Sequence, residues 1–159
     1  MIDPMESLIG LQEALIARTV QLQKCELHPS IRVLLDHPND TPRFTYAIIE
    51  DNKVQAIALF VLTDPVSGTP CFQIGYAVIE KMRNKGVGKK ILEEAIEELT
   101  HGLSRSSIKE FYLEAIVSTF NEASNKIATK LISAAVKCDK DAYSDEQAYQ
   151  YLRKICTSL

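Results

Sequence analysis

The chain has 159 residues, of which 46% are hydrophobic and 25% are charged, and its formal net charge is −3. This composition is that of a soluble globular protein, and the length predicts one ordinary domain over residues 1–159. An acidic balance argues against a general nucleic-acid binder, and no apolar run approaches the roughly 20 residues of a membrane span. We therefore expect neither a nucleic-acid partner nor a membrane association.

The N-terminus and the cysteines both favour a cytoplasmic protein. Asp3, Glu6 and Glu13 stand where a secretory signal would need cations, which argues against export. The cysteines are too scattered to form a C-x-x-C or another metal-ligand spacing, so we expect reduced thiols and no metal site. They are Cys25, Cys71, Cys138 and Cys156.

The first forty residues are predicted to be mostly helical. Apolar residues recur with helical spacing between Pro4 and Lys24, and Pro4 suits the first turn of a helix. Residues 27–38 are broken by prolines, and Ser30 is a candidate cap for one or two further helical turns that end near Leu35.

Three strands are predicted in the next segment. Residues 44–50 and 54–63 are rich in β-branched and aromatic side chains, and the bend at residues 50–53 joins them into a hairpin. Residues 64–70 form a second tight connection, and a third strand covers residues 71–79. Because parallel neighbours need long crossovers, these short connections predict an antiparallel meander.

The second half of the chain alternates between helix and strand. A helix is predicted to begin after Gly86 and to run to about His101, where Gly102 stops it. A strand at residues 108–117, a helix at 120–136 and a last strand at 149–155 follow. The acidic residues of the helix that follows Gly86 are expected to form a solvated face. They are Glu93, Glu94, Glu97 and Glu98. The predicted fold class is α+β, a mixed, mostly antiparallel sheet with helices on both faces.

The most informative stretch covers residues 83–90, between the third strand and the helix that follows it. Gly86 and Gly88 let the backbone turn with its N–H groups facing one point, because no Cβ blocks the approach. The helix start adds N–H donors and the positive end of its dipole. Four of the eight residues are cationic. The pattern predicts a cradle for an anion, most naturally a phosphate.

Two common phosphate motifs do not fit this stretch. A nucleotide-binding P-loop needs a glycine where Arg83 stands and a serine or threonine where Lys90 stands. The dinucleotide fingerprint needs a third glycine at the position of Ile91. What remains is an Arg-x-x-Gly-x-Gly motif, which is either an anion site or a solvated basic turn.

This motif resembles a known one. Arg83-x-x-Gly86-x-Gly88 after a strand resembles the coenzyme A pyrophosphate loop of the GNAT superfamily of N-acetyltransferases. The resemblance implies a GNAT-like fold and acetyl-CoA as a cosubstrate, with no metal. In that family the strand before the loop parts from its neighbour, and its N–H groups bind the pantetheine arm and polarise the thioester. The residues implied to bind acetyl-CoA are Ala77, Val78, Ile79, Arg83, Asn84, Lys85, Gly86, Val87, Gly88, Lys89 and Asn121.

A second motif supports the same resemblance, which covers roughly residues 43–137. An apolar strand over residues 113–117 is followed by Asn121-x-x-Ser124 on a helix, in the order and spacing that the family requires. The serine version, with Gly75-Tyr76 in the strand before the loop, resembles the branch that acetylates ribosomal-protein N-termini and related amines. That branch implies Ser124 as the catalytic residue that assists the leaving thiolate. The alternative role for Ser124 is a helix hydroxyl bonded to a backbone carbonyl.

The chain also departs from the family pattern. Many members carry a tyrosine acid at the position of Ala128 and some carry a glutamate base near the position of Gln73. Glu80 and Glu114 are the remaining nearby carboxylates. The helix after Asn121 lacks the usual Gly-Phe or Gly-Tyr ending, and the first strand of the family is hard to find in the N-terminal region.

The resemblance implies an acetyl-CoA-dependent N-acetyltransferase, an acyltransferase that acts on a protein N-terminus or a small-molecule amine. The alternative is a non-catalytic CoA-binding or regulatory module on the same fold, because Gln73 and Ala128 leave both usual acid–base positions empty. A third reading is a protein-interaction domain whose basic turn is incidental. The amine acceptor, the acyl chain length and a homodimer stay open at the level of sequence.

Overall fold

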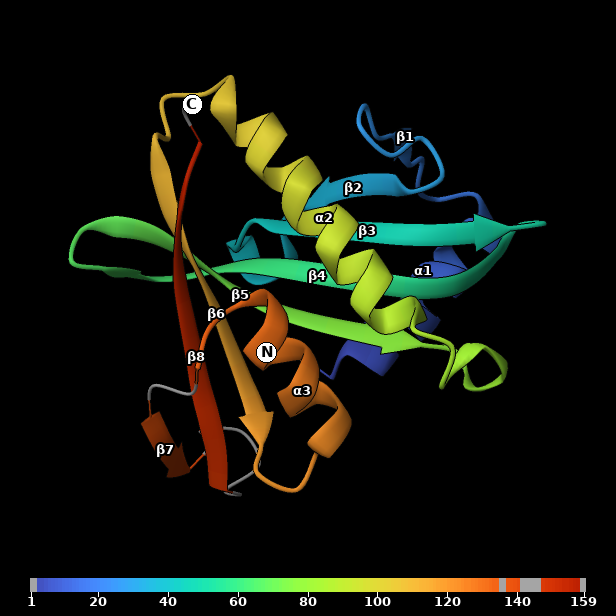
Figure 1. Cartoon of the computed structure of the whole chain (residues 1–159). Helices are drawn as coiled ribbons and strands as arrows, with labels where there is room; N and C mark the ends of the chain where they lie inside the picture. The colour runs from blue at the N-terminus through green and yellow to red at the C-terminus, as the bar shows by residue number, and fades with distance from the viewer. Residues whose placement is uncertain (1–2, 135–136, 141–146, 158–159) are drawn as a thin grey trace. The chain divides into compact units, whose positions relative to one another are not determined.

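The structure, a computed structural model, describes residues 3–134, 137–140 and 147–157 (Figure 1). In these residues the helices are α1 (Pro4–Ala17), α2 (Val87–Ser104) and α3 (Glu122–Leu131), with 3-10 turns η1 (Pro38–Asp40) and η2 (Glu80–Met82). The strands are β1 (Gln23–Lys24), β2 (Arg32–Asp36), β3 (Arg43–Glu50), β4 (Lys53–Val66), β5 (Thr69–Val78), β6 (Glu110–Ser118), β7 (Lys137–Lys140) and β8 (Gln147–Cys156).

The chain contains two compact units. Unit 1 comprises residues 1–61 and 75–102, and unit 2 comprises residues 62–74 and 103–159. Strands β4 and β5 each contribute to both units, so the division cuts strands and not a linker. The prediction of a single domain stays a prediction.

In unit 1 the strand order is β1-β2-β3-β4, and the second half of β5 follows β4. The pairing is antiparallel between β1 and β2, between β2 and β3, and between β3 and β4. Asp51 and Asn52 join β3 to β4, and both adopt the left-handed conformation, with φ of 50° and 63°. Two such residues form the tight hairpin turn whose twist matches that of the flanking strands. The predicted hairpin is therefore confirmed.

The N-terminal helix is shorter than predicted. Instead of reaching Lys24, α1 ends at Ala17, because Arg18 adopts a left-handed conformation with φ of 57° and its N–H caps the helix. The hydroxyl of Thr19 also bonds to the Ala14 carbonyl and helps to close this end. The residues beyond it lead into the short edge strand β1.

The second N-terminal prediction was wrong, because residues 32–36 form strand β2 and not helical turns. This strand pairs along its whole length with β3, from Arg32↔Ala47 to Asp36↔Arg43. At its end the Arg43 guanidinium binds the Asp36 carboxylate through two bonds of 3.0 and 2.7 Å. Pairing with strand β3 thus outweighed the local helix signal.

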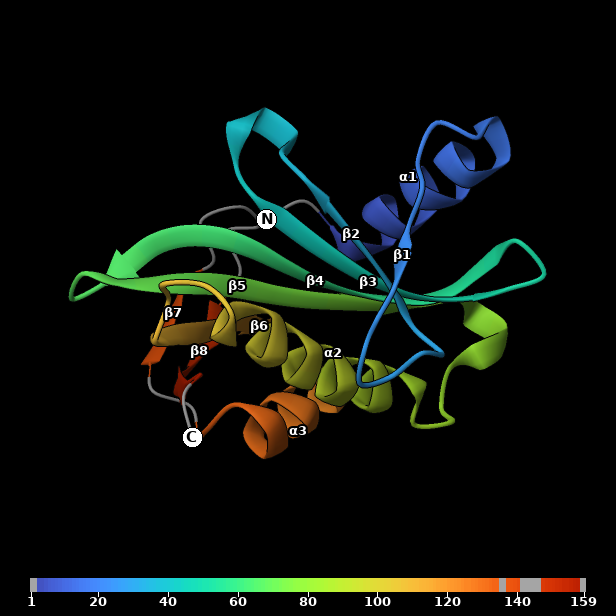
Figure 2. The same cartoon turned by 90° about the horizontal axis from the view of Figure 1, so that it is seen from above.

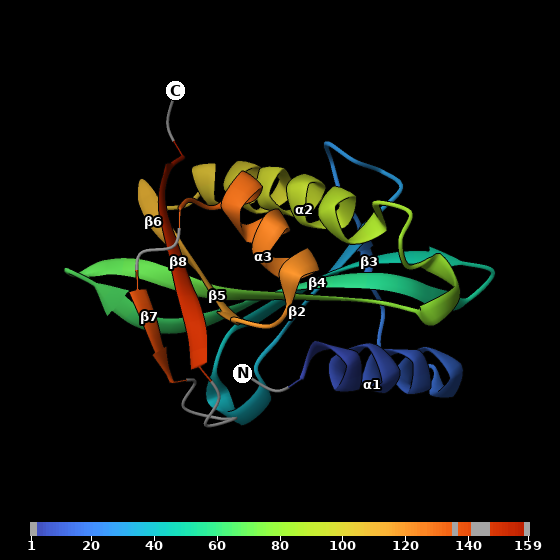
Figure 3. The same ribbon diagram turned by 60° about the horizontal axis from the view of Figure 1, so that its bottom comes forward.

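Helices cover both faces of the sheet of unit 1, as predicted (Figure 3). On one face α1 packs on a cluster of buried apolar residues, which includes Leu8, Leu11, Ala47, Ile57 and Leu59. On the opposite face lies α2, whose buried apolar residues include Ile91, Leu92, Ala95, Ile96 and Leu99. There the rings of Tyr46 and Phe60 meet edge to face with centroids 5.6 Å apart.

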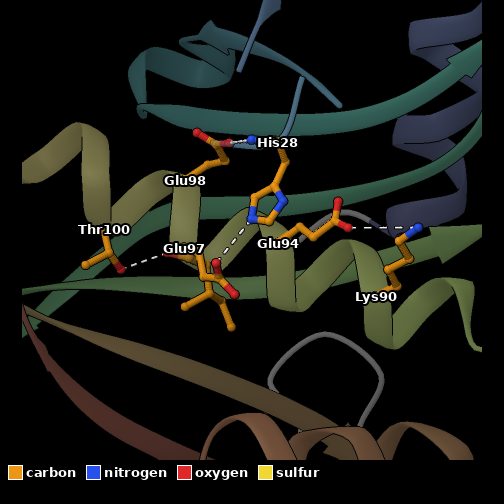
Figure 4. Close-up of polar contacts among 7 residues, drawn as sticks. His28, Lys90, Glu94, Glu97, Glu98 and Thr100 are labelled. Atoms are coloured by element: carbon orange, nitrogen blue, oxygen red, sulfur yellow. Dashed lines mark hydrogen bonds and ion pairs between the residues drawn. The ribbon is translucent and has the colours of Figure 1, made fainter. Parts of the chain in front are cut away.

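The segment between β1 and β2 is bound to α2 by polar contacts (Figure 4). His28 donates its backbone N–H to the Glu98 carboxylate and places its ring nitrogen 3.1 Å from Glu97. A second contact has the histidine on the helix and the carboxylate on the segment: a ring nitrogen of His101 in α2 lies 2.9 Å from the Glu26 carboxylate. The prediction of a solvated acidic face was therefore wrong for Glu98, whose exposed fraction is only 6%. A backbone donor compensates for its burial.

Unit 2 contains the strand order β5-β6-β8-β7, with only the first half of β5 in this unit. The pairing of β5 with β6 is parallel and short, from Cys71↔Tyr112 to Gln73↔Glu114, whereas β6 and β8 pair antiparallel over the full length of β6. The sheet is therefore mixed and mostly antiparallel, as predicted. Helix α3 lies beside β6 and β8 (Figure 1).

Two further helix ends differ from the prediction. Gly102 does not stop α2, which continues to Ser104. Leu103 is buried there, and burial of a leucine outweighs the ~1 kcal/mol that a helical glycine costs. Helix α3 ends at Leu131, short of the predicted Val136, which lies outside the described residues. Strand β7, at residues 137–140, was not predicted.

Among the residues that the structure describes, no helix combines the length and the apolar character needed to cross a membrane. The same residues contain no group of three or more His, Cys, Asp or Glu side chains arranged to hold a metal ion.

Candidate functional site

The basic stretch of unit 1 forms a compact turn between β5 and α2 (Figure 2). After β5 the chain makes the single turn η2, in which the Met82 N–H bonds to the Ile79 carbonyl at 2.9 Å. Asn84 and Gly86 then adopt left-handed conformations, with φ of 60° and 76°. The predicted strand, glycine turn and helix start are therefore all present.

The turn leaves the N–H groups at the start of α2 without helical acceptors. The Lys90 N–H bonds to the Gly86 carbonyl at 3.1 Å, which makes Gly86 the cap residue of the helix. The N–H groups of Val87, Gly88 and Lys89 belong to the first turn, where no earlier helical carbonyl is available. These three donors, with the positive end of the helix dipole, suit an anion.

The two glycines serve different physical needs. Gly86 has a left-handed φ, and a Cβ placed there would meet nothing within 4 Å. Gly88 has no such φ, but a Cβ there would lie 2.7 Å from Cε2 of Tyr76 and 3.5 Å from Cγ2 of Val78. Gly86 therefore permits the turn, whereas Gly88 permits the close packing of α2 on β5.

Arg83 is tied to the backbone of the strand that precedes it. Its Nε donates to the Val78 carbonyl at 3.0 Å, which holds the side chain across the turn. In the sequence it is accompanied by Lys81, Lys85, Lys89 and Lys90, so the turn is locally basic in a chain of net charge −3. Such a local excess of positive charge attracts anions to this end of unit 1.

The three predicted strand residues differ in what they offer a ligand. The Ile79 N–H already bonds to the Gln55 carbonyl of β4 at 3.0 Å. Because N–H groups alternate in direction along a strand, the Val78 N–H points away from β4. Among Ala77, Val78 and Ile79, Val78 is thus the residue whose N–H suits a ligand on the side of β5 opposite β4.

The second predicted motif lies in unit 2, at the junction of β6 and α3. Asn121 is the N-cap of α3, and its Oδ1 accepts from the Ser124 N–H at 3.1 Å. The structure therefore brings Asn121 and Ser124 together, with Ser124 in the first turn of the helix. The Asn121 N–H in turn bonds to the Ser118 carbonyl at 3.0 Å.

Two further residues at this junction were not singled out from the sequence. The Tyr151 hydroxyl on β8 donates to Oδ1 of Asn125 at 2.7 Å, and Nδ2 of Asn125 donates to the carbonyls of Ser118 and Asn121, both at 2.9 Å. The spacing of Asn121 and Asn125 by one helical turn was a visible signal. The contact with Tyr151 was not, because it joins positions 26 apart.

One candidate base, Glu114, has a structural partner. Gln73 lies beside Glu114 in the register of β5 and β6. The Glu114 carboxylate accepts from Nε2 of Gln150 at 2.6 Å. Ala128, at the tyrosine position of the related family, is buried with an exposed fraction of 4%. Within the described residues, neither Gln73 nor Ala128 supplies an acid or a base.

The buried thiols are poor nucleophiles. Burial, with a smaller contribution from the Glu114 carboxylate, raises the pKa of Cys71 from 9.0 to about 11. Burial, with a smaller contribution from Glu98, raises the pKa of Cys25 to about 12. Only about a thousandth of the Cys71 thiol is ionised at pH 8, and the thiolate is the reactive form.

We therefore expect a thiol-specific disulfide reagent at pH 8 to modify the exposed Cys138 and Cys156 quickly, and Cys25 and Cys71 only after unfolding. Mass spectrometry of peptides from native and urea-treated protein identifies the modified residues. Fast modification of native Cys71 would contradict its assignment as a packed, protonated thiol.

The same pKa shifts predict a loss of stability at alkaline pH. The unfolded chain releases these two protons near pH 9, whereas the folded chain keeps them to about pH 11 and 12. The stabilisation is therefore complete below pH 9 and is lost as the pH rises through that window. The free energy of unfolding should fall between pH 8.5 and 10.5, and it should fall less in a Cys25→Ala variant. Urea denaturation at each pH measures this difference.

Residues 11–133 match the model of the acetyltransferase (GNAT) family. Among solved structures, the chain is similar to RimL, a ribosomal L7/L12 alpha-N-protein acetyltransferase in complex with coenzyme A, with a TM-score of 0.55 and 21% identity. The match covers 73% of this chain and 64% of that protein. A comparison with curated proteins gave no match.

Two further structures share the fold. The ribosomal-protein-S5-alanine acetyltransferase of Vibrio fischeri has a TM-score of 0.55 at 13% identity, over 72% of this chain and 62% of that one. The IAA acetyltransferase of Bacillus cereus has a TM-score of 0.51 at 17% identity, and the match covers 72% of this chain and 78% of that one. The chain thus spans less than two thirds of the length of the two ribosomal-protein acetyltransferases, and identities this low establish the fold alone.

Proposed function

The chain belongs to the acetyltransferase (GNAT) family, and we propose that it transfers an acetyl group from acetyl-CoA to a primary amine, either a protein N-terminus or a small-molecule amine. The observation that carries the proposal is the turn between β5 and α2, which lies inside the matched residues 11–133. It combines first-turn N–H donors with a row of cations. A pyrophosphate, such as that of acetyl-CoA, is the ligand that this combination suits.

Several of the predicted residues then have a chemical role. The N–H groups of Val87, Gly88 and Lys89 bind the pyrophosphate, and Arg83 adds charge at the rim of the turn. The N–H of Val78 donates to the thioester carbonyl, on which negative charge develops during attack. The amine nitrogen bonds to the carbonyl carbon, the carbon–sulfur bond breaks, and the proton lost by the amine ends on the sulfur.

Ser124 is proposed to donate a hydrogen bond to the leaving sulfur and to relay that proton. If so, Ser124→Ala should lower kcat by about 10-fold to 100-fold and leave KM for the amine nearly unchanged. Steady-state kinetics at saturating acetyl-CoA measures both constants. Thr129→Ala is the matched control, because it removes another hydroxyl of α3, one that bonds to the Asn125 carbonyl. An unchanged kcat in Ser124→Ala would assign Ser124 a structural role.

The non-catalytic alternative rests on Gln73 and Ala128, which hold no acid or base. Mass spectrometry of acetylated product from a panel of amines and peptides separates the two functions, and it avoids the background from Cys138 and Cys156 in a thiol assay. Acetylated product would establish the enzyme. Binding of coenzyme A in calorimetry without any product would establish the binding module, and no binding would indicate an interaction domain.

The nature of the amine follows from the absence of an identified strong base. An α-amino group has a pKa near 8 and a lysine side chain near 10.4, so at neutral pH about a tenth of the α-amine is neutral, against under a thousandth of the lysine amine. We expect transfer to a free N-terminus to exceed transfer to lysine by about two orders of magnitude. Rates on unblocked peptides and on N-blocked, lysine-containing peptides test this. Faster transfer to lysine would point to an additional base, and Glu114 would be the first to replace.

A cytoplasmic location, the identity of the acceptor and a homodimer stay predictions in this proposal.

A further inference from the structure

Both polar atoms of the Asn125 side-chain amide form hydrogen bonds. Its Oδ1 accepts from the Tyr151 hydroxyl at 2.7 Å, and its Nδ2 donates to the carbonyls of Ser118 and Asn121, both at 2.9 Å. Tyr151 is buried, with an exposed fraction of 3%. An amide with three partners on three elements has one permitted orientation, and a network of this kind is rigid when fully satisfied.

The three partners surround the first turn of α3. Ser118 is the last residue of β6, Asn121 caps the helix, and Tyr151 lies on β8. The Asn121 side-chain oxygen accepts a hydrogen bond from the Ser124 N–H at 3.1 Å, and the Asn121 carbonyl accepts one from Nδ2 of Asn125. The two asparagines thus form one connected network, and Ser124 sits between them in the chain.

We propose that Tyr151 and Asn125 form a brace that positions the Ser124 hydroxyl for acetyl transfer, and this rests on the function proposed above. Both are positioning residues, because they act through Asn121 and the first helical turn. The brace sets the direction of that turn relative to β6 and β8, which a cap by Asn121 alone does not do. A displacement of the donor by about 1 Å is enough to reduce a rate strongly.

The docking of α3 does not depend on the brace. At its far end the Arg153 guanidinium of β8 donates to the Leu131 carbonyl at 2.8 Å. Ala128 and Ile132 are buried with exposed fractions of 4% and 6%. These contacts hold the helix in place when the Tyr151 hydroxyl is removed. Arg153 therefore provides a matched control on the same strand and the same helix.

The test is a double-mutant cycle in the full chain. Tyr151→Phe should lower kcat by about threefold to tenfold, the range expected from one hydrogen bond, with the KM for the amine and the Kd for coenzyme A unchanged. In the Ser124→Ala background the same change should have no further effect on kcat, because the positioned group is already absent. Arg153→Ala should leave kcat unchanged. An unchanged kcat in Tyr151→Phe, or an equal loss in both backgrounds, would overturn the proposal.

Hydrogen exchange tests the brace without any turnover. Tyr151→Phe should speed the exchange of the Ser124 and Asn125 amides by about threefold to tenfold. The Ile132 amide, which bonds to the Ala128 carbonyl at the far end of α3, should keep its rate. Unchanged Ser124 exchange would overturn the brace whatever the kinetics show. If the wild-type chain transfers no acetyl group to any amine, the proposed function and the catalytic role of the brace fall together, while altered exchange would still establish the structural contact.

Discussion

Replacement of Gly86 by valine should raise the Kd for coenzyme A by at least tenfold, about 1.4 kcal/mol. The backbone at Gly86 has φ of 76°, which a β-branched residue adopts only with strain. Because Gly86 is also the cap residue of α2, a shift of its backbone turns the first N–H groups away from the anion. The side chain itself would meet nothing within 4 Å, so the effect comes from the backbone and not from a clash within the turn.

A graded series makes this prediction specific. Asparagine tolerates the left-handed conformation, so Gly86→Asn should weaken binding least, alanine more and valine most. Gly68→Val is the matched control, because Gly68 has φ of 79° and equal space in the turn between β4 and β5. It should lower the melting temperature and leave the Kd unchanged. Wild-type affinity in all Gly86 variants, measured by calorimetry, would remove the turn as the pyrophosphate site.

Gly88→Ala should destabilise the fold by about 1–3 kcal/mol, the usual cost of an overpacked contact. The added Cβ would lie 2.7 Å from Cε2 of Tyr76, so either the ring must rotate or α2 must move off β5. Coenzyme A binding should weaken with it, since the first turn of α2 carries the proposed donors. Urea denaturation and calorimetry on the same variant measure the two effects.

A second substitution identifies the cause. Tyr76→Val removes the ring, and in this background Gly88→Ala should cost at most a few tenths of a kcal/mol. Gly102→Ala is the control for helix propensity, because a Cβ at Gly102 meets nothing within 4 Å and should stabilise α2 by about 0.5–1 kcal/mol. If the loss of stability at Gly88 persists without the Tyr76 ring, the contact with that ring is not its cause.

Local patterns accounted for much of the fold. The hairpin turn at Asp51 and Asn52, the helix after Gly86 and the strand over residues 110–118 are each specified by neighbouring residues. Strand β2 was missed because Arg32–Asp36 is short and flanked by prolines, and its structure depends on pairing with β3. The same holds for Glu98, whose burial requires the backbone of His28, seventy positions away.

The features of the candidate site also fall into two groups, those specified by local sequence and those that depend on distant contacts. The sequence by itself determined the family, the glycine turn proposed to bind an anion and the Asn121-x-x-Ser124 motif, because these depend on spacing along a short segment. Only the tertiary structure decided that Gly88 is required by the ring of Tyr76, and that Tyr151 holds the first turn of α3 through an asparagine. Contacts of this kind join side chains far apart in the chain, and neither partner carries a local signal of the other. Their free energy arises from packing and from satisfied buried hydrogen bonds, which exist only once the elements have met.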